Sequence, residues 1–86
     1  MTKIWVVQRI EYDPESAFQE NDLLAAFVDR EKGVNFLEAI RQSMLEADKT
    51  APSYTPGELE DFGTSIQLAA GDDKLMHYLY PVDLVS

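Results

Sequence analysis

The stretch "DLLAAFVDREKGVNFLEAIRQSMLEADK", residues 22–49, decides the fold because it holds the clearest helical pattern of the chain. Apolar residues recur in its second part at the i, i+3, i+4 spacing of an amphipathic helix, with polar residues opposite. The apolar stripe comprises Val34, Leu37, Ile40, Met44 and Ala47, flanked by Phe36 and Leu45. Asp29 precedes the pattern as a helix-capping residue, so the sequence predicts a helix from Arg30 to Lys49.

The first eight residues of this stretch, 22–29, fit either a strand or a short helix. A strand is favoured, because a helix that begins after Asp29 needs a non-helical residue before it. Gly33, in the first helical turn, costs up to about 1 kcal/mol relative to alanine and would fit a close backbone approach.

The remaining segments alternate in the manner of strands. Residues 3–12 predict a strand that ends at Asp13-Pro14, since proline cannot donate to a neighbouring strand. A strand in "DFGTSIQLA", with Phe62 and Thr64 on its buried side, turns at "AGDDK" into a returning strand in "KLMHYLYPVDLV". Pro81 ends its pairing or lies on an edge.

These elements predict a single α+β domain over residues 1–86. The expected order is β-β-α-β-β, with one helix packed on a mostly antiparallel four-stranded sheet. The order β-α-α-β-β is the alternative, if residues 22–29 are helical.

Composition limits the classes of function. The chain has 86 residues, 45% of them hydrophobic, and a formal net charge of -9. Such a domain folds, repels bare nucleic acid and anionic membranes, and attracts basic protein surfaces. Cysteine is absent and no stretch approaches a membrane span, so we expect a cytoplasmic protein.

The segments "KIWVVQRIEYD" and "AAFVDREKGVNFL" resemble short, mostly uncharacterised bacterial and phage proteins. These share an opening strand, an acidic loop and a strand that leads through F-x-D-x-E-K into a helix. The resemblance covers roughly residues 3–45. It implies the fold and a phage or mobile-element setting, and it assigns no functional residue.

The sequence gives little support for a catalytic or a metal-binding role. A calcium loop starting at Asp13 would need an oxygen ligand, a glycine and a carboxylate at its fifth, sixth and twelfth positions, which hold Ala17, Phe18 and Leu24. His77 is the only histidine, and its place within a predicted strand is typical of a packed residue. We therefore expect no metal, no cofactor and no enzymatic activity.

Acidic residues are concentrated in two stretches. Six carboxylates and no Lys or Arg lie between Ile10 and Asp29, and five lie between Thr50 and Asp73. Aromatic residues accompany them, and this combination suits docking to a Lys/Arg-rich protein surface. The candidate partner-binding residues are Glu11, Asp13, Glu15, Phe18, Glu20, Asp22, Tyr54, Glu58, Glu60, Asp61, Asp72 and Asp73.

Three hypotheses follow, all compatible with a homodimer; the first is favoured and the other two are alternatives. The first is an inhibitor of the anti-CRISPR or anti-restriction type, including DNA mimics, that occupies a basic nucleic-acid-binding surface. The second is a toxin-immunity or regulatory protein that caps a protein partner through aromatic residues such as Tyr78 and Tyr80. The third is a small enzyme or ligand-binding domain, which would need a cleft near His77.

Overall fold

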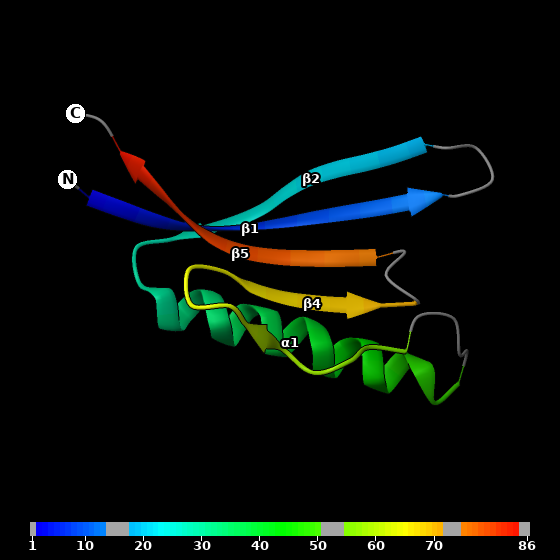
Figure 1. Cartoon of the computed structure of the whole chain (residues 1–86). Helices are drawn as coiled ribbons and strands as arrows, with labels where there is room; N and C mark the ends of the chain where they lie inside the picture. Colours follow the sequence, from blue (N-terminus) through cyan, green and yellow to red (C-terminus); the bar gives the residue numbers. More distant parts are fainter. Residues whose placement is uncertain (1, 14–17, 51–54, 72–74, 85–86) are drawn as a thin grey trace.

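The computed structural model describes residues 2–13, 18–50, 55–71 and 75–84. One helix lies against one face of a five-stranded antiparallel sheet with the strand order β2-β1-β5-β4-β3 (Figure 1). The elements are β1 Thr2–Asp13, β2 Phe18–Phe27, α1 Arg30–Asp48, β3 Glu60–Asp61, β4 Ile66–Ala70 and β5 Leu75–Leu84.

The α+β class predicted from the sequence is confirmed, and the sheet has one strand more than expected. The additional strand is β3, whose two residues pair with Gln67 and Ile66 of β4. So short a strand leaves no alternating pattern to read.

Residues 22–27 are strand, so the alternative with two helices is wrong. β2 also begins earlier than expected, at Phe18, and pairs with β1 back to Asp13. Glu20 and Asp22 therefore belong to a strand rather than to a connection. The pairing shifts register between Val7 and Gln8, which leaves Leu24 as an extra residue between the pairs on either side.

The core lies between α1 and the sheet. Val7, Ile66 and Leu79 of three strands meet Leu37 of α1, and these four side chains are buried. Gly33 is where the helix comes closest: a Cβ atom there would lie 2.5 Å from a methyl group of Leu79. The close approach expected at this glycine is thus confirmed. The group that comes close is the Leu79 side chain and not another backbone segment.

The helix begins and ends near its predicted limits, at Arg30 and Asp48. Asp29 occupies the capping position with an extended backbone, and its side chain makes no capping hydrogen bond. Phe36 of the helix packs on Phe27 of β2, with ring centroids 5.5 Å apart, so residues from both halves of the opening stretch meet.

The strand predicted around Phe62 and Thr64 starts later, at Ile66. Residues 62–65 instead turn the chain between β3 and β4. Gly63 adopts a φ of 88°, and its N–H donates to Asp61 Oδ1 at 2.8 Å. This turn chemistry outweighs the apolar character of Phe62, which is 57% exposed.

β5 is an interior strand, between β1 and β4. β4 ends its pairing opposite Leu79, and beyond that residue β5 has only β1 beside it. Pro81 lies in this one-sided part, opposite Trp5, where a missing N–H is tolerated.

Within the ranges the structure describes, the single helix lacks the run of apolar residues needed to cross a bilayer.

Candidate functional site

The side of the sheet away from α1 is covered by no other element that the structure describes. Because Val7 and Leu79 point to the helix, alternation places Val6, Gln8 and Tyr80 on the opposite side. We call this side the open face. Following the register, its described members are Ile4, Val6, Gln8, Ile10, Tyr12, Asn21, Leu23, Ala26, Glu60, Gln67, Ala69, Met76, Tyr78, Tyr80 and Val82.

The open face is nearly free of charge. Among its described residues Glu60 alone is ionisable at neutral pH, although the chain as a whole carries a formal charge of -9. Several large apolar side chains on it are exposed, among them Leu23 at 70% and Tyr12 at 46%. An exposed apolar surface with a polar border is typical of a protein-interaction site.

A row of polar groups crosses the centre of the open face. The Tyr80 hydroxyl donates to Gln8 Oε1 at 3.1 Å, and Gln8 Nε2 donates to Asn21 Oδ1. The row links side chains of β5, β1 and β2.

A hollow of about 420 Å³ lies where the open face reaches β3. Its lining combines one carboxylate, one amide, one aromatic ring and one thioether, from Glu60, Gln67, Tyr78 and Met76, with Ala69 beneath them. A carboxylate beside an aromatic ring is suited to a Lys or Arg side chain, which pairs with the first and lies over the second.

Comparison with protein-family models, curated proteins and solved structures found no match.

The carboxylates predicted as partner-binding residues form two separate groups. Glu11, Glu20 and Asp22 lie on β1 and β2, at one edge of the sheet, whereas Glu60 and Asp61 form β3 at the other edge. At about 4.8 Å between adjacent strands, the two edges are about 19 Å apart.

The group on β1 and β2 is partly neutralised. Arg9 pairs with Glu11 at 3.1 Å and with Asp22 at 3.8 Å. Glu20 lies directly opposite Glu11 in the strand register, where two like charges oppose pairing. Arg9 and Glu11 point to the helix side of β1, whereas Gln8 points to the open face. Their register partners Asp22 and Glu20 point the same way, so these carboxylates lie on the helix side of the sheet.

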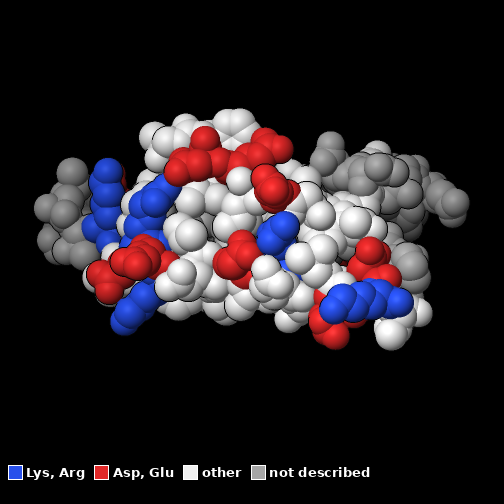
Figure 2. All heavy atoms as spheres, turned by 90° about the horizontal axis from the view of Figure 1, so that it is seen from below, with Lys and Arg blue, Asp and Glu red and all other residues white. Residues whose placement is uncertain are grey.

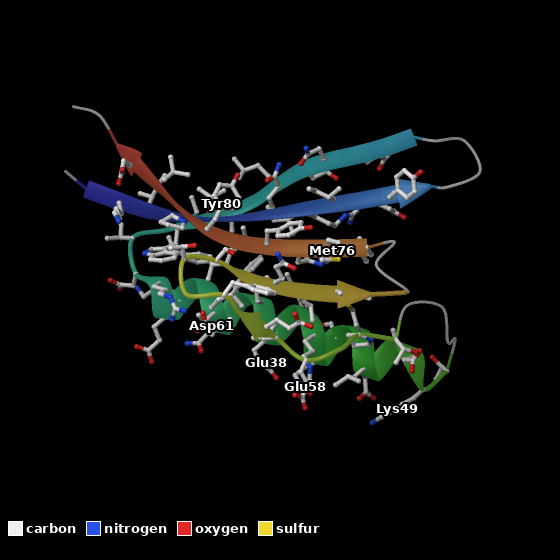
Figure 3. All side chains as sticks on the ribbon, in the orientation of Figure 1. Glu38, Lys49, Glu58, Asp61, Met76 and Tyr80 are labelled. Carbon is white, nitrogen blue, oxygen red and sulfur yellow. The ribbon has the colours of Figure 1, made fainter. Side chains whose placement is uncertain are left out.

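The carboxylates near β3 lie beside α1. Arg30 binds Asp61 at 3.0 Å, and Arg41 donates to the carbonyl of Gly57 at 2.9 Å and binds Glu38 at 3.2 Å. In Figure 3, Glu38, Glu58 and Asp61 lie below β4, beside α1, while Tyr80 and Met76 lie on β5 above. Figure 2 views the molecule from the helix side and shows carboxylates and cations interleaved there.

Asp61 has a pKa below its ordinary value. The hydrogen bond from the Gly63 backbone N–H is the largest cause, and the hydrogen bond from Arg30 adds to it. Asp61 therefore stabilises the turn and a contact to α1, which gives it a structural role in addition to its predicted one.

The other predicted residues cannot be placed with these groups. Glu15, Tyr54, Asp72 and Asp73 lie outside the described residues, and Asp13 and Phe18 are placed only by their backbones. Within the described ranges, no three His, Cys, Asp or Glu side chains are grouped in a way that could hold a metal ion.

Sequence reasoning missed part of the site. It named Tyr78 and Tyr80 as anchors and Glu60 as a carboxylate, but not Gln67 and Met76, which complete the hollow. Alternation along residues 75–80 does place Met76 and Tyr78 on one face. The pairing of β3 with Gln67 could not be read from the sequence, because the strand has only two residues.

Proposed function

We propose that this protein is a non-enzymatic binding protein, and that it docks a protein partner on the open face of its sheet. The observation that carries the proposal is the open face itself, an uncharged and largely apolar surface that ends in the hollow beside Glu60. On a protein with a formal charge of -9, a sheet side almost free of charge stands apart from the rest of the surface.

The partner has a basic surface. The formal charge of -9 steers such a surface toward the protein, and the aromatic residues then anchor it. At the border of the open face, a Lys or Arg of the partner enters the hollow, pairs with Glu60 and lies over the ring of Tyr78. Net charge thus speeds the encounter with the partner, and the aromatic contacts fix the partner's orientation.

A toxin-immunity or regulatory protein that caps its partner is the form that fits this surface best. Its partner would be held by aromatic and apolar contacts, as the open face offers around Tyr78 and Tyr80. An inhibitor that occupies a nucleic-acid-binding surface is the second candidate, favoured by the net charge. A DNA mimic would need a continuous array of carboxylates, whereas the predicted partner-binding carboxylates on the described strands divide between two edges of the sheet.

Site-specific photo-crosslinking tests which face binds. A photoreactive residue at Leu23 or Val82, both exposed on the open face, is compared with one at Gln42, exposed on the far side of α1. In lysate of the host, we expect one protein to be captured from the two open-face positions and not from Gln42. Capture from Gln42 alone would contradict the proposal.

Charge reversal then tests the hollow. Glu60→Lys and Glu46→Lys change the net charge equally, but Glu46 lies on α1 and pairs with Lys49. With the captured partner, we expect Glu60→Lys to weaken binding about tenfold, about 1.4 kcal/mol, and Glu46→Lys to have little effect. Equal weakening by both would indicate steering by net charge only, with no use of the hollow.

A further inference from the structure

β2 is a long strand with a free edge. β1 lies on one side of it, and no strand that the structure describes lies on the other (Figure 1). The opposite edge of the sheet is formed by β3, which has only two residues. In an edge strand every second residue directs its N–H and C=O away from the sheet. β2 therefore offers a row of backbone groups with which a further strand could pair.

The regular part of this edge is residues 18–23. These residues pair with β1 in unbroken register, and the register shift at Leu24 ends the regular stretch. From Glu20 to Leu24 every residue is exposed. Proteins often protect an edge strand with proline or lysine, and β2 contains neither. Backbone pairing is therefore open along these residues, and their side chains decide which strand is accepted.

The helix side of this edge carries more negative than positive charge. Glu11, Glu20 and Asp22 lie on it. Arg9 is the cation that pairs with this group, at 3.1 Å from Glu11 and 3.8 Å from Asp22, so one guanidinium faces three carboxylates. Side chains of adjacent strands lie about 5 Å apart on one face of a sheet. Lys or Arg on an added strand would therefore reach Glu20 and Asp22.

The open-face side of the same edge is uncharged. Asn21 and Leu23 lie on it, and Leu23 is 70% exposed. An added strand with an apolar residue beside Leu23 would cover this side chain. Since successive residues of a strand point to opposite sides, the fitting strand alternates Lys or Arg with apolar residues. A second copy of β2 does not fit, because it would bring carboxylates against carboxylates.

We propose that an extended segment of a partner protein, in which Lys or Arg alternates with apolar residues, adds to the sheet beside residues 18–23 of β2. Its backbone pairs with the free edge, its cations lie beside Glu20 and Asp22, and its apolar residues lie beside Leu23. This inference does not rest on the proposed function. The hollow beside Glu60 is at the other edge of the sheet, so the two sites can be tested separately.

An octapeptide of alternating lysine and valine, capped at both ends, is the probe. It is titrated at about 0.15 M salt into the full chain labelled with ¹⁵N and followed by NMR. We expect saturable shifts of the backbone amides of Glu20 to Leu23, and slower hydrogen exchange at those that point outward. A peptide with the same residues in two blocks, lysines and then valines, should bind about tenfold more weakly.

Charge reversal locates the contact on β2. Glu20→Lys should weaken binding of the alternating peptide about tenfold. Glu60→Lys makes the same change of net charge at the opposite edge and should have little effect. Unperturbed spectra elsewhere in each variant establish that it is folded. Equal weakening by both variants would show that only net charge attracts the peptide, and it would overturn the proposal.

Backbone methylation separates strand pairing from attraction between charges. In an extended peptide the lysine N–H groups point to one edge and the valine N–H groups to the other. N-methylation of all lysines or of all valines therefore blocks one edge and leaves the charge unchanged. We expect one of these two peptides to lose binding about tenfold and the other to bind like the parent. Equal binding of the two, or no saturable shift with the parent peptide, would overturn the proposal. Protection of the β2 amides that grows with protein concentration, without peptide, would assign the edge to a second copy and overturn it too.

Discussion

Gly33 allows α1 to approach the sheet, because a Cβ atom there would lie 2.5 Å from a methyl group of the fully buried Leu79. Alanine gains up to about 1 kcal/mol of helix propensity, but overpacking a core costs about 1–3 kcal/mol. We expect Gly33→Ala to lower the free energy of unfolding by about 1 kcal/mol in urea denaturation. Asn35→Ala, exposed on the same helix, is the control and should not destabilise. A Gly33→Ala protein more stable than the parent would contradict this packing.

His77 makes stability depend on pH. Its pKa is lowered from the ordinary value of 6.5, mainly by burial and then by Arg9, so the unfolded chain binds a proton more readily than the folded one. Protonation thus favours unfolding, and the contribution of His77 is complete above pH 6.5 and is lost as the pH falls through its lower folded value. Urea denaturation from pH 7.5 downward should show this loss. His77→Gln should reduce it, and an identical pH profile in that variant would refute the assignment.

At the scale of elements, the turn between β3 and β4 depends on Asp61, which accepts from the Gly63 N–H and pairs with Arg30. Asp61→Asn keeps an acceptor for Gly63 and loses the ion pair, whereas Asp61→Ala loses both. We expect the Gly63 amide to exchange hydrogen faster in Asp61→Ala and close to the parent rate in Asp61→Asn. Equal exchange in the two variants would mean that Arg30, and not the turn bond, holds β3 in place.

Elements with a long repeating pattern could be predicted from the sequence, and those fixed by pairing could not. The helix limits followed from the spacing of Val34, Leu37 and Ile40, and the faces of β5 followed from the alternation of His77 and Leu79. The start of β2 at Phe18 is set by its pairing with Asp13 of β1, which the local pattern of residues 18–22 does not show. Phe62 was predicted to lie in a strand because it is hydrophobic. The hydrogen bond from the Gly63 N–H to Asp61 turns the chain at this point instead.

At the scale of the whole molecule, the candidate site could likewise be predicted from the sequence only in part. The sequence indicated an acidic protein with aromatic anchors, but it could not tell that the predicted partner-binding carboxylates on its strands divide between two edges of the sheet. Nor could it reveal that the strand order leaves one side of the sheet uncovered, since strand order depends on contacts between distant segments.

Repulsion between copies should keep the protein monomeric at low salt despite its open face, because each carries a formal charge of -9. At about 1 M salt the screening length falls to about 3 Å, and we expect self-association to appear in sedimentation velocity. Leu23→Lys, on the open face, should suppress it. Val28→Lys, at a residue equally exposed but beyond the end of β2, should not. Suppression by both variants would place the contact elsewhere.

The pairing of β1 with β5 determines when the chain can fold. Thr2 lies opposite Leu84 and Glu11 opposite Leu75, so the centre of the sheet joins two strands that are synthesised far apart in time. Closing so long a loop is entropically costly and slow, whereas the β1–β2 hairpin and α1 can form locally. While β5 is still inside the ribosome, Val7 and Leu37 lack the Leu79 side chain that later covers them. The nascent chain therefore emerges with this part of its core exposed to water until β5 is released.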